Sequence, residues 1–222
     1  MAITRFPVSL LLSIILCSGS LAMASEFSDL SAKAKSGDAV AQYDLGSSYA
    51  NKNRKGRGKT KDDKNAVLWY TRAAEQGLAT AQFDLGRMYI TGSGVTRDFE
   101  QGLAWQIKAA ELGLARAQFA IGKRYLFGAD LTRDYEQALE LISKAAEQGL
   151  TGAHSQLGAM YFKGEGVPKD YVQAYKWFGI AAANDDAYAN RLLSVLAEVM
   201  DQEQIEEAQE LAAQWPAEHE AD

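Results

Sequence analysis

The sequence offers few side chains that could carry out catalysis or bind a metal. It has two histidines, His154 and His219, and a single cysteine, Cys17. Two isolated histidines do not form a zinc site. A Ser-His-Asp triad could use only His154, because His219 lies in the C-terminal tail, and neither a G-x-S-x-G turn nor an S-x-x-K motif is present. These patterns argue against a hydrolase.

Glycine turns and acidic residues give no more support to enzyme chemistry. Gly92-x-Gly94 and Gly164-x-Gly166 follow helical patterns rather than strands and lack the lysine of a phosphate-binding loop. Acidic residues recur at helix-capping positions, and those between Asp201 and Glu210 form an acidic face that we interpret as solvated. We predict no catalytic residue, no cofactor site and no metal site.

The first 24 residues have the pattern of a signal peptide. Arg5 precedes an apolar core from Val8 to Cys17, and Ala22-Met23-Ala24 is a small-x-small cleavage site. We expect cleavage after Ala24 and a periplasmic protein, with secretion as the alternative. An uncleaved anchor and a lipid anchor on Cys17 are the other interpretations. Cleavage would remove the only cysteine, leaving neither a disulfide nor a thiolate metal site.

Composition favours a helical, acidic protein. Hydrophobic residues make up 47% and charged residues 23% of the 222 residues, and helix formers outnumber β-branched residues. The net charge of −6 becomes −7 if Arg5 leaves with the signal peptide. This charge disfavours general nucleic-acid binding. No later apolar run is long enough to span a bilayer, so no further transmembrane segment is predicted.

A nine-residue motif occurs four times, beginning at Ala41, Ala81, Ala117 and Ala153. Its glycines are 40, 36 and 36 residues apart, so the first repeat has a four-residue insertion. The second half of each repeat is equally regular, with Trp69, Trp105, Leu141 and Trp177 each preceding an Ala-Ala pair. His154 takes the motif position that glutamine holds in the other repeats, so we interpret it as a helix residue.

Each repeat predicts two amphipathic helices, A and B. Apolar positions at i, i+4, i+5 and i+8 define one face of helix A, whose glycine permits close approach of a neighbouring helix. Helix B is predicted to begin after an aspartate N-cap and to end at a glycine, which Asp185 replaces in the fourth repeat. The four N-cap residues are Asp62, Asp98, Asp134 and Asp170.

The combined pattern, A-Q-x-x-L-G-x-x-Y, then G-x-G-V-x-x-D-[YF]-x-x-A-x-x-W, then A-A-E-x-G, resembles the Sel1-like repeat family, relatives of the tetratricopeptide repeats. The resemblance covers about residues 38–185. It implies an all-α fold, a right-handed α-solenoid of helix-turn-helix repeats. Bacterial members of this family act as periplasmic regulators of sensor kinases, flagellar motor components and assembly factors for polysaccharide secretion.

The predicted organisation places atypical segments at both ends of the repeats, where they would cover the apolar ends of the solenoid. The last helix is predicted to begin after Asp201, with Gln204 at N3, and to run through Gln214 until Pro216 stops it. The predicted segments are a signal peptide at 1–24, an N-terminal capping helix at 25–37, repeats at 38–77, 78–113, 114–149 and 150–185, C-terminal capping helices at 186–215 and a tail at 216–222.

Two surfaces are candidates for binding. On each helix A, the third motif residue and the positions four and seven further along are expected to line a concave face suited to a peptide or helix with acidic residues. The alternative is that the aromatic residues pack between repeats. The predicted partner-binding residues are Tyr43, Phe83, Arg87, Ile90, Phe119, Lys123, Leu126 and Phe162.

The second candidate is a basic loop in the first repeat, between helices A and B. It holds six basic side chains and no acid within the segment 51–61, and it could contact an anionic surface or an acidic partner. The alternative is a flexible insertion. The six residues are Lys52, Arg54, Lys55, Arg57, Lys59 and Lys61.

The sequence therefore favours a non-enzymatic exported scaffold that binds another envelope protein. A secreted or surface effector that contacts host proteins is one alternative. A hydrolase of cell-wall or β-lactam substrates is the other, and the inventory of side chains argues against it.

Overall fold

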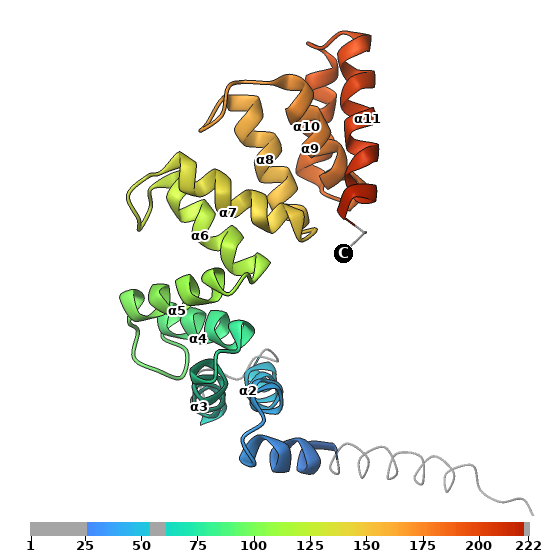
Figure 1. The fold of residues 1–222 in the computed structure, drawn as a ribbon. Helices are drawn as coiled ribbons and strands as arrows, with labels where there is room; N and C mark the ends of the chain where they lie inside the picture. Colours follow the sequence, from blue (N-terminus) through green and yellow to red (C-terminus); the bar gives the residue numbers. More distant parts are fainter. Residues whose placement is uncertain (1–25, 54–60, 220–222) are drawn as a thin grey trace, which may run out of the picture. The chain divides into compact units, whose positions relative to one another are not determined.

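Every regular element in the described part of the chain is a helix. The computed structural model describes residues 26–53 and 61–219 (Figure 1). A compact unit ends at Trp105 and a second begins at Gln106, within α5. The predicted all-α fold of sequentially packed repeats is confirmed. A helix at 26–35 precedes α2 (Ala39–Asn53), α3 (Lys61–Glu75), α4 (Ala79–Thr91), α5 (Phe99–Glu111), α6 (Ala115–Phe127), α7 (Tyr135–Glu147), α8 (Thr151–Lys163), α9 (Tyr171–Ala183), α10 (Ala187–Ala197) and α11 (Gln202–His219).

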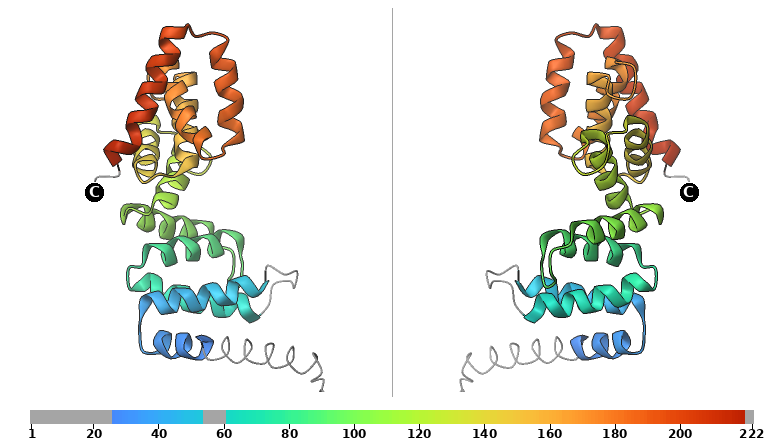
Figure 2. Two further views of the ribbon diagram at one scale, coloured as in Figure 1. Left: turned by 90° about the vertical axis from the view of Figure 1, so that its right-hand side faces the viewer. Right: turned by 90° about the vertical axis from the view of Figure 1, so that its left-hand side faces the viewer.

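Helices that follow one another along the chain mostly pack together within each unit. In the second unit α6 packs on α7, α7 on α8 and α8 on α9, while α10 and α11 both pack on α9 (Figure 2). The motif glycines bring these helices close together. A Cβ added to Gly122 would lie 2.8 Å from Ile142 Cγ1, and one added to Gly158 would lie 2.7 Å from Phe178 Cδ1. Both glycines therefore lie at tight contacts between helices A and B, as the motif predicted.

The turns follow the sequence signals. Asp134 and Asp170 are the N-caps of α7 and α9, where their carboxylates accept hydrogen bonds from first-turn amides. Gly92, Gly128 and Gly164 end the A helices in the left-handed conformation that glycine adopts most easily. Among the described residues, Asp185 is the only non-glycine with positive φ, at 62°. It adopts the backbone conformation of the glycine that it replaces.

The first repeat departs from the predicted boundaries. Helix α2 continues to Asn53, because Lys52 occupies the position of the glycines that end α4, α6 and α8. Helix α3 begins at Lys61, so Asp62 lies in its first turn rather than before it. A carboxylate there still interacts favourably with the helix N-terminus. The backbone of Lys52 and Lys61 is thus helical, and the rest of the basic loop, like the predicted signal peptide, lies outside the described residues.

The C-terminal helix begins as predicted and ends later. Asp201 Oδ1 accepts from the Gln204 amide at 2.9 Å, and Gln204 Oε1 accepts from the Asp201 amide at 3.2 Å, which is a capping box. The expectation that Pro216 stops the helix is wrong, because α11 continues to His219. Trp215 packs on Trp177 of α9, with ring centroids 4.6 Å apart, and this contact holds the turn before the proline in place.

Candidate protein-binding groove

The same hydrogen bond joins helix A to the preceding helix in every repeat. In each helix A, the second motif residue donates from its side chain to the carbonyl eight residues earlier, at the end of the preceding helix. Gln42 reaches Ala34 at 3.1 Å, Gln82 reaches Ala74 at 3.1 Å and Gln118 reaches Ala110 at 3.4 Å. His154 Nε2 lies 2.9 Å from the Ala146 carbonyl. The interpretation of His154 as a helix residue is therefore confirmed.

In the first unit, the predicted binding residues take part in packing. The Tyr43 hydroxyl donates to Asp84 Oδ2 at 3.0 Å, and its ring lies 5.5 Å from that of Tyr70. Arg87 extends from α4, half-exposed, with its guanidinium 3.4 Å from Asp84 Oδ1. Phe83 is half-buried on the same helix. Tyr43 therefore packs between repeats, as the alternative interpretation proposed.

A buried tyrosine adjoins this cluster. Burial raises the pKa of the Tyr70 hydroxyl, while a hydrogen bond with Ser47 acts in the opposite direction. The two hydroxyl oxygens are 3.1 Å apart. Tyr43 and Arg87 both contact Asp84, so Tyr43 joins the first repeat to the second.

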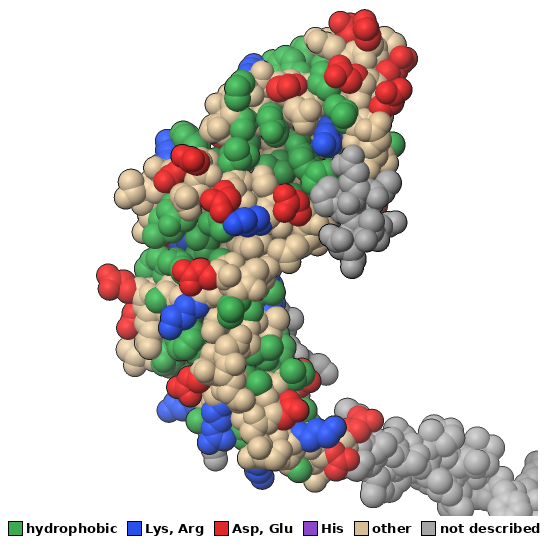
Figure 3. All heavy atoms as spheres, in the orientation of Figure 1, with side chains coloured by type: hydrophobic (Ala, Val, Ile, Leu, Met, Phe, Trp, Pro, Cys, Tyr) green, Lys and Arg blue, Asp and Glu red, His purple; other side chains and the backbone are tan. Residues whose placement is uncertain are grey.

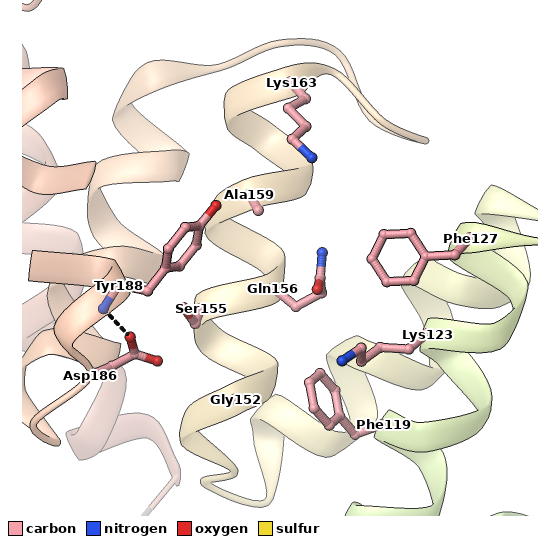
Figure 4. A pocket seen from close by; sticks show the side chains of 10 residues that line it. All are labelled: Phe119, Lys123, Phe127, Gly152, Ser155, Gln156, Ala159, Lys163, Asp186 and Tyr188. Atoms are coloured by element: carbon pink, nitrogen blue, oxygen red, sulfur yellow. Dashed lines mark hydrogen bonds between the residues drawn. The ribbon is translucent and has the colours of Figure 1, made fainter. Parts of the chain in front are cut away.

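In the second unit, the A helices border a groove of about 300 Å³. Figure 4 shows Phe119, Lys123 and Phe127 on α6, and Tyr188 on α10 facing them across α8. The floor is formed by α8. The groove is lined by Phe119, Lys123, Phe127, Gly152, Ser155, Gln156, Ala159, Lys163, Asp186 and Tyr188.

Phe119 contributes both to this groove and to the core. Its ring lies against α8 where Gly152 leaves space, since a Cβ there would be 3.2 Å from Phe119 Cε1. It is half-buried and packs on the core cluster around Ile142. The Lys123 amine lies 5.4 Å from the centroid of the same ring, a cation–π distance. Phe127 and Tyr188 are more open, with 49% and 46% of their surface exposed.

Two predicted residues on these helices are not in the groove. Leu126 is 2% exposed and belongs to the core around Ile142, so its assignment to a partner-binding surface is wrong. Phe162 packs against Tyr171 of α9, with centroids 5.8 Å apart. In the first unit Ile90 has the same relationship to α5, because a Cβ on Gly102 would meet Ile90 Cγ1 at 2.7 Å.

These three residues share one register position, seven after the third motif residue. That position points toward helix B of the same repeat. The groove instead uses the position eight after it, which is Phe127 on α6 and Lys163 on α8. A helical wheel centred on Lys123 rather than on Phe119 would have found Phe127, whereas Tyr188 comes from a helix outside the four motifs.

Two lysines lie at the rim of the groove. Lys123 and Lys163 both have exposed side chains, and Lys163 Nζ lies 3.8 Å from Glu165 Oε2. Asp186 is the carboxylate of the lining, and its Oδ1 already accepts from the amides of Tyr188 and Ala189, each at 2.9 Å. The groove therefore presents aromatic rings beside lysine amines, which can pair with carboxylates.

The second surface of note is acidic and lies on the last helix. Acidic side chains gather over α11 (Figure 3), where Glu203, Glu206, Glu207 and Glu210 are exposed. Within residues 26–53 and 61–219, no three His, Cys, Asp or Glu side chains are placed to hold a metal ion. None of the helices described in this structure is both long and apolar enough to cross a membrane.

The fold and the groove define a helical-repeat protein whose A helices border a surface open to a ligand. The Sel1 repeat family model matches residues 39–78, 79–114, 115–150 and 152–186, which is more than half of the chain. The chain therefore belongs to the Sel1 repeat family.

Two solved structures are similar to this chain in sequence and fold. A Sel1 repeat protein from Oxalobacter formigenes is 36% identical, with a TM-score of 0.68 over 75% of this chain and 47% of that one. The protein c5321, a protective antigen present in uropathogenic Escherichia coli strains, is 30% identical, with a TM-score of 0.55 over 86% of this chain and 48% of that one. The chain spans about half the length of these relatives. The comparison with curated proteins gave no match.

Proposed function

We propose that this protein is a non-enzymatic scaffold of the bacterial envelope, exported by cleavage after Ala24, that binds another protein in the groove between α6, α8 and α10. The observation that carries the proposal is the pairing of exposed aromatic rings, Phe127 and Tyr188, with two lysine amines around one groove. Repeat proteins of this kind typically mediate protein interactions, and membership of the Sel1 family supports the same role.

The chemistry of the groove indicates the ligand. An aromatic or leucine side chain of a ligand would contact Phe119 or Phe127, and carboxylates beside it would meet Lys123 and Lys163. We therefore propose a peptide segment with an apolar anchor flanked by aspartate or glutamate. The acidic charge of the rest of the chain would weaken general attraction to such a peptide, so the contact depends on the groove itself.

The test is an array of fluorescent peptides with a central Phe or Leu, flanked in matched sets by Glu, Gln or Lys. We expect the Glu set to bind most tightly. Phe127→Ser should weaken the binding of all three sets, whereas Leu68→Ser, which removes a similarly exposed side chain from α3, should not. Equal binding of all three sets, or equal effects of the two substitutions, would rule out the groove as the binding site.

A further inference from the structure

Helix α10 and the turn that follows it present a row of apolar side chains to solvent. Tyr188, Val195 and Val199 are 46%, 45% and 60% exposed, and Leu192 between them is half-buried. These residues are four, three and four positions apart, the spacing of the apolar seam of a coiled coil. Figure 2 shows α10 at one edge of the second unit, with α11 on the other side of α9.

Charged residues flank this row on one side only. Arg191 and Glu198 are both exposed and are seven residues apart, so they share a side of the helix. Glu198 is the C-cap and keeps right-handed helical angles, with φ −78° and ψ −21°, so it continues the path of α10. On the other side of the row, Ala189 and Leu196 are fully buried against the core around Phe178.

We propose that this face of α10 pairs with the same face of a second copy of the chain, with the two helices antiparallel. A two-fold axis between Arg191 and Glu198 would bring Arg191 against Glu198 of the partner subunit, and would repeat that ion pair by symmetry. In a parallel pair, the charged side of one helix would face the side that Ala189 and Leu196 occupy, which is already buried. The charge pattern therefore selects the antiparallel arrangement and makes the face complementary to itself.

The length of this apolar row indicates how stable the proposed dimer should be. From Tyr188 to the end of α10 at Ala197 the helix advances about 14 Å. A helix pair of this length buries less surface than a typical stable interface, so the dimer forms reversibly and depends on concentration. This inference goes beyond the proposed function. Because Tyr188 also lines the groove, the test leaves that residue unchanged.

The experiment is sedimentation equilibrium of the purified full chain over a range of concentrations. Arg191→Glu and Glu198→Arg each turn two attractive pairs into two repulsive ones, so each should raise the dimer dissociation constant about tenfold. An equimolar mixture of these two variants should dimerise at least as well as the original protein, because every pair in the heterodimer is attractive. Glu203→Arg on α11, an exposed reversal outside the face, is the matched control.

Two further measurements separate this proposal from different modes of association. Val195→Ser with Val199→Ser should abolish the dimer at an unchanged melting temperature, because both side chains are already largely exposed. The groove peptides should still bind that variant. A protein that is monomeric at all concentrations, or a dimer that neither substitution set weakens, would overturn the proposal. So would a mixture of the two charge variants that associates no better than either alone.

Discussion

The Phe119 ring on α6 lies over Gly152 on α8, close enough that a Cβ on the glycine would be 3.2 Å from Cε1. A side chain at this position would have to move the ring by a few tenths of an ångström. The ring forms one wall of the groove as well as part of the core. The absence of a side chain at Gly152 thus determines the position of the Phe119 ring in the groove.

Gly152→Ala should therefore weaken peptide binding with little change in stability. Alanine favours the helix over glycine by up to about 1 kcal/mol, which offsets the cost of shifting Phe119. Fluorescence anisotropy with the acidic peptides measures the first effect and thermal unfolding the second. Unaltered peptide binding would show that the position of Phe119 does not matter for recognition.

Gly122→Leu should destabilise the second unit strongly. The new Cβ alone would lie 2.8 Å from Ile142 Cγ1 and 3.3 Å from the Ala138 carbonyl oxygen, so α6 and α7 must separate. Overpacking of this kind costs about 3 kcal/mol. Urea unfolding measures the loss, and Lys123→Leu, at the next and exposed position, is the control. If both variants lost the same amount of stability, the close contact at Gly122 would not be the cause of the loss.

Asp185→Gly should stabilise the protein. The aspartate has a φ of 62°, which costs a side-chain-bearing residue about 1 kcal/mol and costs glycine almost nothing. We expect a gain of about 0.5 kcal/mol after the greater backbone entropy of unfolded glycine is included. The reverse change, Gly149→Asp, should destabilise, because Gly149 has a φ of 78° with no atom near its Cβ position. A loss of stability in Asp185→Gly would mean that the carboxylate has a structural role.

Stability should fall above pH 10 in part because of Tyr70. Burial raises the pKa of this hydroxyl above its ordinary value of 10.0, so the folded state holds the proton more tightly than the unfolded state. The corresponding stability is fully present below pH 10 and is lost as the pH rises through the folded-state pKa. Urea unfolding between pH 9 and 11 should show a shallower decline in Tyr70→Phe, although that variant loses the hydrogen bond to Ser47. Parallel declines would assign the alkaline sensitivity to other groups.

Export predicts a definite mature N-terminus. The mass of the protein recovered from the periplasm should correspond to a chain that begins at Ser25 and lacks Cys17. The change Ala24→Leu should block cleavage, because signal peptidase requires a small residue there. Recovery of a species that retains Cys17 would contradict the signal-peptide interpretation.

The repeat, its helices and its turns were determined by the sequence alone, because they depend on local chemistry. Aspartate at an N-cap, glycine at a left-handed C-cap and apolar residues at helical spacing act within a few residues of one another. The capping box of Asp201 and Gln204 could be predicted for this reason. So could the close approach at Gly122, since glycine weakens a helix and recurs at this motif position where a neighbouring helix needs the space of a side chain.

The composition of the groove was decided only by the tertiary structure. The helical wheel placed Leu126 on the open face, but Leu126 packs in the core around Ile142 and Phe127 is exposed instead. This packing depends on contacts between helices, such as the close approach of Ile142 on α7 to Gly122 on α6. Tyr188 reaches the groove from α10, where no motif of the repeat marks it. A periodic pattern specifies the face of one helix, whereas a groove is specified by several helices at once.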